Sequence, residues 1–284
     1  MLSKKKDKLK SSSNEKKTKK IIYKTLKKRY MNYKSNVWKK IFTEKDWEKY
    51  IDENWLDDNG SRNHGGYISP EEMKTLLGDN SVLPKEFPKL EVKVNKYTII
   101  IPTCAYNSAL YQKKYISTLR KYLYEFNSDI LELDLSKNGG GKTEVIASGL
   151  LPLFLLQNNK ILTKLELGND KKKKGLIIKN GEINNLPVKV SKAKKILIKP
   201  KKIIIKMSGQ TASAGEQTLL ALTVLKGVTK TIFEGKPTAG FTTWIEYIDL
   251  PNGGGIEFPV GVMTSSKGVK CRKNKKLYPE DLNA

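Results

Sequence analysis

The stretch Ile203–Leu220, IIIKMSGQTASAGEQTLL, decides the fold of this chain. An apolar, β-branched run ends at Met207, small residues follow, and a helical pattern begins shortly after, which predicts a buried strand, a tight turn and a helix. Ser213 falls where the turn becomes the helix, between Ala212 and Ala214. A helix N-terminus supplies unpaired N–H groups and favours developing negative charge. The layout therefore suits a serine nucleophile, although hydroxyl residues at such a turn also serve as helix caps.

The alternation of strand and helix extends to both sides of this stretch. It predicts an α/β layered domain, because consecutive strands joined by helices form a parallel sheet. Two late strands flank the glycine-rich turn Asn252–Gly255. The expected elements of the domain are strands at Tyr97–Pro102, Ile130–Leu135, Ile203–Met207 and Thr231–Phe233, and helices at Ala109–Phe126, Thr143–Gln157 and Ala214–Leu225.

Composition divides the chain into regions. Residues 1–20 are polar and lysine-rich, and we expect them to be disordered. Residues 21–93 carry apolar and aromatic residues at helical spacing and predict a small helical subdomain that includes a loop with His64. Residues 94–284 form the α/β core, within which the lysine-rich segment 162–202 is interpreted as a hairpin insertion around Asn180-Gly181.

The formal net charge is +25, and it is concentrated near the N-terminus. Residues 1–40 hold sixteen Lys or Arg residues against Asp7 and Glu15. A basic N-terminal arm of this kind suits contact with an anionic partner such as nucleic acid, a membrane surface or an acidic protein, and a solvated tail is the alternative. No nucleic-acid-binding module is visible in the sequence.

Cysteine and histidine are scarce. Cys104 and Cys271 lie far apart, and His64 is the one histidine of the chain, so we expect no metal site and no cofactor. Two free thiols fit a reducing compartment. The basic N-terminus is followed by no apolar stretch typical of a signal peptide, and no run is long enough to span a membrane. We therefore expect a cytoplasmic, intracellular protein.

A glycine-rich turn follows the strand Ile130–Leu135, in the sequence LDLSKNGGGKT. Gly141-Lys142-Thr143 invites comparison with a phosphate-binding P-loop, but the first glycine of that pattern would be residue 136, which is Ser136. The alternative interpretation is a rigid turn in which consecutive glycines let backbone N–H groups approach a ligand and form half of an oxyanion hole.

Three segments in order resemble one family of peptidases. LDLSKNGGG is similar to the LDLRxNxGG signature of the tail-specific (C-terminal processing) proteases, the tricorn core protease and the interphotoreceptor retinoid-binding protein repeats. Thr211–Glu216 matches the T-x-SA-x-E motif of that family, and Gly235–Gly240 matches its G-x-x-T-x-G motif. The resemblance covers about Val94 to Pro279 and implies a ClpP/crotonase-like fold of layered β-β-α units.

The resemblance also implies roles for particular residues. Ser213 would be the nucleophile of a serine endopeptidase acting on peptide or protein substrates, and the backbone N–H of Ala214 with that of Gly140 or Gly141 would form the oxyanion hole. Glu216 is interpreted as a structural residue at the helix start. The supporting residues of the motifs are Asp134, Asn138, Glu216, Thr238 and Gly240.

The sequence departs from the family at several positions. Ser136 replaces the arginine of LDLR, and Phe241 stands where the tail-specific proteases have a catalytic lysine. The nearby Lys236 matches no catalytic position and is interpreted as a surface residue. The segment between His64 and Tyr97 is too short for a PDZ domain. The tricorn-like branch uses histidine as the base, which points to His64 as the group that removes the Ser213 proton.

The group that orients His64 stays open. Lys273 stands where the family's acidic residue is expected, and Glu246, Asp249 and Glu257 are alternatives that the sequence does not separate. Two further functions remain as alternatives to an active peptidase. One is a catalytically silent relative that binds peptides or another ligand in the same cleft, and the other is a basic protein that binds nucleic acid or other anions. The sequence predicts no oligomeric state.

Overall fold

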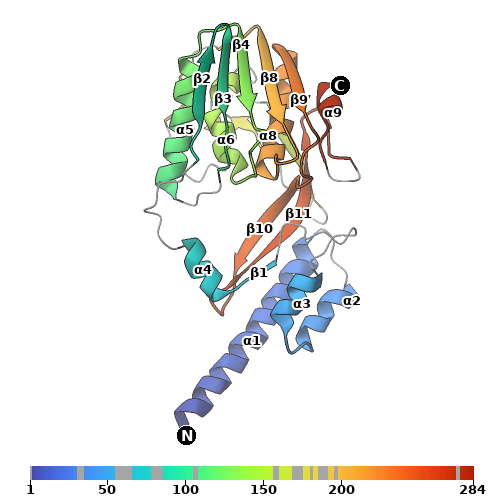
Figure 1. The fold of residues 1–284 in the computed structure, drawn as a ribbon. Coiled ribbons are helices and arrows are strands. Elements are labelled where there is room, and N and C mark those ends of the chain that lie inside the picture. Colours follow the sequence, from blue (N-terminus) through green and yellow to red (C-terminus); the bar gives the residue numbers. More distant parts are fainter. Residues whose placement is uncertain are drawn as a thin grey trace. The chain divides into compact units, whose positions relative to one another are not determined.

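The computed structural model describes residues 2–30, 35–54, 66–77, 86–104, 108–155, 160–167, 175–179, 182–184, 191–194, 198–272 and 276–284. The chain forms two compact units (Figure 1). Unit 1 comprises Met1–Asp79, Glu166–Lys173 and Thr243–Val262, and unit 2 comprises Asn80–Leu165, Lys174–Thr242 and Met263–Ala284.

Unit 2 is built on a five-stranded sheet in the order β2-β3-β4-β8-β9. Strand β2 is antiparallel to β3, and the other neighbouring pairs are parallel. The mixed α/β class predicted from the sequence is therefore confirmed. The strands are β2 (Lys89–Lys93), β3 (Lys96–Ile100), β4 (Ile130–Asp134), β8 (Lys202–Met207) and β9 (Lys230–Gly235).

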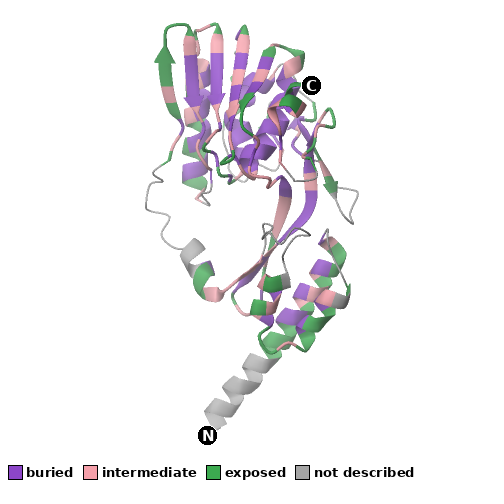
Figure 2. Cartoon of the chain, turned by 45° about the vertical axis from the view of Figure 1, so that its right-hand side comes forward, coloured by how far each residue is buried: buried purple, intermediate pink, exposed green. Residues whose placement is uncertain are grey.

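Helices cover one face of this sheet, where Figure 1 shows α5, α6 and α8 behind the strands. The apolar residues of the strands alternate along the chain and gather on that face, because successive side chains of a strand point to opposite sides. Figure 2 shows the central strands of this sheet buried along their middles and less buried at their ends. The residues that form this core layer include Tyr97, Ile99, Leu131, Leu133, Ile203, Ile205 and Phe233.

The helices and smaller strands of unit 2 connect and flank the sheet. Helix α5 ends close to the expected position, whereas the helix expected over Thr143–Gln157 is interrupted at Leu150. Pro152 explains the interruption, because proline lacks a backbone N–H and its ring clashes with the carbonyl four residues earlier, that of Ser148. These elements are α5 (Ala109–Tyr124), α6 (Thr143–Gly149), α7 (Leu151–Phe154), β5 (Thr163–Leu167), β6 (Ile178–Lys179), β7 (Glu182–Ile183), α8 (Ala214–Leu222), η3 (Thr223–Gly227) and α9 (Pro279–Asn283).

The insertion contains an antiparallel pair of short strands, β6 and β7, in which Ile178 lies opposite Ile183. The predicted turn between them, Asn180-Gly181, lies outside the described residues.

Unit 1 packs N-terminal helices against a C-terminal hairpin. Strands β1, β11 and β10 are antiparallel neighbours. Trp38, Trp47 and Ile51 from the helices share one core with Ile256 and Phe258 from β11. The elements are α1 (Leu2–Arg29), α2 (Ser35–Trp38), η1 (Lys39–Phe42), α3 (Trp47–Asn54), β1 (Gly66–Ile68), α4 (Pro70–Leu77), β10 (Thr243–Asp249) and β11 (Gly255–Ser265).

The division of the chain differs from the sequence interpretation in one respect. The sequence placed a helical subdomain at 21–93 and assigned all of 94–284 to the core, whereas Thr243–Val262 groups with unit 1. The reason is long-range: an isolated two-stranded hairpin is marginally stable, and the helices supply the apolar surface against which this one packs.

Residues 1–20 are expected from their composition to be disordered, whereas α1 runs from Leu2 to Arg29 in the structure. Lysine is a good helix former, and the segment contains no glycine or proline. Glu15 and Lys19 form an ion pair of 2.8 Å one helical turn apart. Among the described residues, no helix has the length and apolar character needed to cross a membrane.

Candidate active site

Ser213 lies between the end of β8 and the first residue of α8, and it adopts a strained backbone conformation. Its φ is 51° and its ψ is −116°. In the described part of the chain, Asn95 is the other non-glycine residue with positive φ. Positive φ brings the side chain of an L-residue too close to its own backbone, so a serine held there at a strand-to-helix turn is a candidate functional residue. Its side chain is partly exposed and therefore accessible to a ligand.

The carboxylate of Glu216 holds the Ser213 turn in place. It accepts hydrogen bonds from the backbone N–H of Ser213 at 3.0 Å and of Gly240 at 2.9 Å. It also accepts bonds from the Phe241 N–H and the Thr238 hydroxyl. Burial raises the pKa of Glu216, and these four donors act in the opposite direction. The side chain joins two loops that are far apart in sequence, so its role is to position them.

The hydroxyl of Ser213 is engaged as a helix cap. Its Oγ accepts a hydrogen bond from the Glu216 N–H, which together with the bond from the Ser213 N–H to the Glu216 carboxylate forms a capping box. The sequence interpretation of Ser213 as a cap at the start of α8 and the interpretation as a nucleophile are therefore compatible. Among the described residues, none of the titratable side chains forms a hydrogen bond to the Ser213 Oγ.

Asn138 shapes the glycine-rich turn after β4. Its Nδ2 donates to the carbonyls of Ile101 and Pro102, both at 3.0 Å, and its Oδ1 accepts from the Gly140 N–H at 3.0 Å. The side chain is fully buried. Asp134 stabilises the start of the same turn by accepting the Ser136 N–H at 2.9 Å. The turn therefore keeps its shape through these two side chains although Ser136 replaces the arginine of the family signature.

The glycine turn and the serine turn touch at Gly140. A Cβ built on Gly140 would lie 2.9 Å from the Cβ of Ser213, and the φ of Gly140 is 122°. Only glycine fits both the conformation and the space at this position. The backbone N–H of Ala212 also donates to the Asn138 carbonyl at 2.9 Å, which fixes the two turns relative to each other.

Two backbone amides next to Ser213 remain available as donors. The Gly140 N–H already binds Asn138, which argues against it as an oxyanion donor. The backbone N–H of Cys104 donates to the Gly140 carbonyl, and the backbone carbonyl of Cys104 accepts the Lys142 N–H. In this parallel pairing the N–H of Gly141 points away from Cys104. Within the described residues, neither Gly141 nor Ala214, the first residue of α8, has an acceptor for its N–H. Of the two glycines left open by the sequence, the geometry favours Gly141.

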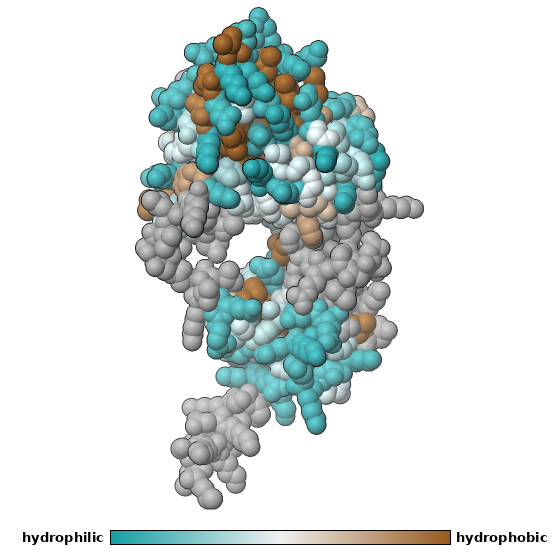
Figure 3. Space-filling model, in the orientation of Figure 1, coloured by the Kyte–Doolittle hydropathy of each residue, from teal (hydrophilic) through white to brown (hydrophobic). Residues whose placement is uncertain are grey.

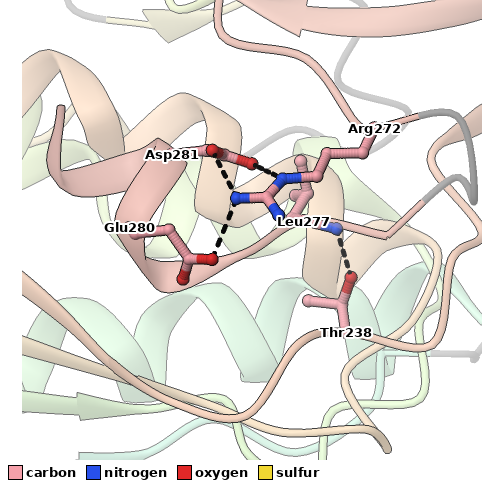
Figure 4. A network of polar contacts seen from close by, with 5 residues as sticks. All are labelled: Thr238, Arg272, Leu277, Glu280 and Asp281. Atoms are coloured by element: carbon pink, nitrogen blue, oxygen red, sulfur yellow. Dashed lines mark hydrogen bonds and ion pairs between the residues drawn. The ribbon is translucent and has the colours of Figure 1, made fainter.

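The C-terminal segment supports the loop that follows β9. Thr238 exchanges backbone and side-chain hydrogen bonds with Leu277, at 3.0 Å for Thr238 N to Leu277 O and 2.9 Å for Leu277 N to Thr238 Oγ1. Figure 4 shows this link beside the Arg272 guanidinium, which binds Asp281 at 2.7 Å and Glu280 at 2.9 Å. The tail thus anchors Thr238, whose hydroxyl binds Glu216. Sequence motifs gave no signal for the role of Leu277, because it depends on tertiary pairing.

Several predicted residues cannot be placed in this site. His64 and Lys273 lie outside the described residues, so the proposed base stays a prediction. Glu246 and Asp249 lie in β10 and Glu257 in β11 of unit 1.

Two of these three carboxylates have a partner, and Glu257 is partly buried. Arg29 forms an ion pair with Glu246, and the Tyr247 hydroxyl donates to Asp249 at 2.9 Å. Burial raises the pKa of Glu257.

The structure also bears on Lys236, on the comparison with a P-loop and on a metal site. Lys236 is exposed, as expected of a surface lysine. The hydroxyl of Thr143 is buried and donates to Gln217, so it is not free to hold a metal ion as the corresponding hydroxyl of a P-loop does. In the described part of the chain, the His, Cys, Asp and Glu side chains do not gather into a group of three or more that suits a metal ion.

The sequence pattern of peptidase family S41 matches residues 98–280. This range contains the serine turn, the glycine turn and the Thr238 loop described above, and it exceeds half of the chain. The protein therefore belongs to peptidase family S41, as the resemblance of the three motifs predicted. Comparison of the sequence with curated proteins found no relative.

Two solved structures resemble the whole chain. A lipoprotein from Streptococcus agalactiae is 22% identical, covers 94% of this chain and 91% of its own, and superposes with a TM-score of 0.74. A putative peptidase from Parabacteroides merdae ATCC 43184 is 12% identical, covers 94% and 89%, and has a TM-score of 0.53. At these identities the likeness shows the fold. Because the first of these structures is a lipoprotein, the expectation of a cytoplasmic, intracellular protein was wrong.

Proposed function

We propose that the protein is a serine peptidase in which Ser213 attacks the carbonyl carbon of a peptide bond. The observation that carries the proposal is the strained Ser213 at the N-terminus of α8, held by Glu216 and packed against Gly140. Strain of this kind persists only where surrounding contacts enforce it, and it presents the hydroxyl at the surface of the turn. Membership of family S41 supports the same chemistry.

The oxyanion of the tetrahedral intermediate would lie between the N–H groups of Ala214 and Gly141. Both amides lack an acceptor among the described residues, and one of them begins a helix. Each donor of this type contributes roughly 3 kcal/mol to the stability of the transition state in comparable enzymes. The Gly140 N–H, by contrast, serves the turn through Asn138. The proposed fold around these residues is ClpP/crotonase-like, without a PDZ domain.

His64 is the proposed general base, which takes the Ser213 proton and then returns it to the leaving amine. An imidazole titrates near neutral pH and suits both steps. The support is the family resemblance and the absence of any other histidine in the chain. A lysine base at the position after Gly240 is excluded by Phe241.

A second function is favoured by one observation: among the described residues, none of the titratable side chains forms a hydrogen bond to the Ser213 Oγ. A silent relative that binds peptides at the same site would lack such a base. Peptide hydrolysis by the full chain distinguishes the two functions. We expect turnover of a mixed peptide library followed by mass spectrometry, and its loss by at least about a thousandfold in Ser213→Ala.

Ser117→Ala is the matched control, because Ser117 is exposed on α5 and outside the site. It should cleave the same peptides at the unaltered rate. Binding of peptides without cleavage by the folded wild-type chain would establish the silent alternative. Equal cleavage by wild type and Ser213→Ala would refute Ser213 as the nucleophile.

The single histidine gives a clean test of the base. One imidazole means one set of ring resonances in an NMR spectrum of the whole protein. Covalent attachment of a boronate to Ser213 should raise the pKa of a neighbouring His64, because a negative tetrahedral adduct favours the imidazolium. An unchanged His64 titration in the modified protein would remove His64 from the mechanism.

A further inference from the structure

The C-terminal half of α1 is amphipathic, and one side of it is part of the unit 1 core. Ile22, Leu26 and Tyr30 recur every four residues and are 0%, 0% and 3% exposed. They pack with Trp38 and Phe258 in the same core. The helix is therefore held in a fixed rotation relative to unit 1, which determines which residues face outward.

The outward side of this half consists of lysines. At 100° per residue they occupy a sector of about 120° of the helix circumference. All are exposed, and none has an ion-pair partner among the described residues. We call this surface the lysine face, and its members are Lys16, Lys17, Lys20, Lys24, Lys27 and Lys28.

The cations on the opposite side of the same helix are neutralised. Lys19 pairs with Glu15 at 2.8 Å, and Arg29 pairs with Glu246 of β10. The helix thus separates paired cations, which face the protein, from unpaired ones, which face solvent. Lys16, Lys20 and Lys24 follow one another at intervals of four residues. Like charges at this spacing repel each other, and an anionic surface would relieve the repulsion.

An exposed aromatic ring borders the lysine face. Phe42 is 48% exposed and contacts the ring of Tyr23 edge-on at a centroid distance of 5.3 Å. Tyr23 lies three residues after Lys20 and four before Lys27, so it is next to both on the helix surface. Lys39 and Lys40, which precede Phe42, are also exposed. The surface thus combines positive charge with an apolar group at its edge.

We propose that the lysine face together with Phe42 docks unit 1 onto an anionic lipid bilayer. Lysines attract anionic headgroups without fixed geometry, and an aromatic ring beside them inserts at the interface. Figure 3 shows the described surface of unit 1 as mostly hydrophilic with a few separate hydrophobic groups, which suits contact at the bilayer surface rather than deep insertion.

A nucleic acid is less favoured as the occupant of this surface. The face contains lysine and no arginine, and it offers no row of aromatic rings on which bases could stack.

The test is cosedimentation of the full chain with phosphatidylcholine vesicles that contain about one third phosphatidylglycerol. We expect binding that weakens as salt is raised from about 0.05 to 0.5 M, because screening shortens the range of the attraction. Each lysine near an anionic surface is worth roughly a fivefold change in affinity. The variant Lys16→Gln/Lys20→Gln/Lys24→Gln/Lys27→Gln should therefore bind at least about a hundredfold more weakly.

The matched control removes the same charge from unit 2. Lys89, Lys93, Lys113 and Lys230 are exposed there, and their simultaneous change to Gln should leave vesicle binding within about twofold of wild type. Phe42→Ala should weaken binding about three- to tenfold while the circular dichroism spectrum stays unaltered.

Three outcomes would overturn the proposal. The first is no salt-sensitive binding of the wild-type chain to anionic vesicles. The second is equal loss of binding in the two lysine variants, which would mean that total charge rather than this face is responsible. The third is binding to a duplex or single-stranded DNA that depends on the lysine face and exceeds binding to vesicles.

Discussion

Two residues, Ser213 and Glu216, explain most of the geometry of the candidate site. Ser213 is held at positive φ, and Glu216 accepts its N–H while binding the loop after β9 through Thr238, Gly240 and Phe241. The sequence motif predicted the start of α8 and named Ser213 as the candidate nucleophile. It could not reveal that Glu216 reaches the second loop, because that contact depends on the approach of segments more than twenty residues apart.

Glu216→Gln is expected to loosen the Ser213 turn. A carboxylate offers acceptors to all four donors, whereas an amide would direct its NH₂ group at backbone N–H groups that also donate. Leaving buried donors unpaired should cost about 2–3 kcal/mol in the free energy of unfolding, measured by urea titration. The exposed Glu234→Gln should change it by less than about 0.5 kcal/mol. Equal stability of both variants would contradict the role given to Glu216.

The lowered pKa of Glu132 should make the free energy of unfolding depend on pH. Burial raises its pKa, but Lys96 at 2.6 Å and Lys206 at 3.1 Å outweigh this and hold it below its ordinary value of 4.5. The native state therefore binds this proton less tightly than the unfolded state. The stabilisation is fully present above the ordinary value and is lost as pH falls through the lowered pKa.

Comparing the free energy of unfolding of wild type with that of Glu132→Gln at several pH values tests whether the stabilisation is lost on acidification. At about pH 7 the variant should be less stable by about 1–2 kcal/mol, since both lysines are partly exposed and the pair is screened. The difference should shrink as the pH is lowered to about 3. Glu91→Gln, on an exposed position of β2, is the control. A difference that grows on acidification would reverse the assigned direction.

At the scale of elements, the strand–turn–helix units were predictable and their exact extents were not. Strands β4 and β8 are apolar runs bounded by turn residues, so their positions followed from the sequence. The break between α6 and α7 depends on Pro152, which disrupts the preceding turn although the apolar pattern continues through it. In α1, helix propensity and packing of the apolar side overcame a polar composition typical of disorder.

Neighbouring glycines of the turn after β4 provide a matched pair of variants. Gly140→Ala places a Cβ 2.9 Å from the Ser213 Cβ at a φ of 122°, whereas Gly139→Ala meets nothing within 4 Å. Gly140→Ala should reduce kcat/KM for a cleaved peptide by at least about a hundredfold, because the displaced serine loses its alignment. Gly139→Ala should stay within about threefold of wild type. Similar losses in both variants would indicate a general effect on the turn.

For the whole molecule, two cores account for stability. Phe258 belongs to the unit 1 core with the N-terminal helices, and Phe233 is buried in the sheet of unit 2. The sequence could not assign the β10–β11 hairpin to unit 1, because pairing between distant segments leaves no local pattern. The separate cores predict that unfolding is not a single two-state transition.

Calorimetry of Phe258→Ala and Phe233→Ala tests this division. Each change should cost about 3–5 kcal/mol and lower the melting temperature of a different transition. Phe258→Ala should shift the transition that is accompanied by exposure of Trp38 and Trp47, which a tryptophan fluorescence scan follows. A single transition shifted equally by both variants would contradict two separately cooperative units.

Covalent labelling is the sharpest test of Ser213 as a reactive nucleophile. The full chain is treated with a fluorophosphonate probe, and the modified peptide is identified by mass spectrometry. We expect one adduct, on Ser213, that is absent from Ser213→Ala and undiminished in Ser117→Ala. An adduct that persists in Ser213→Ala, or none on the folded wild-type chain, would contradict it.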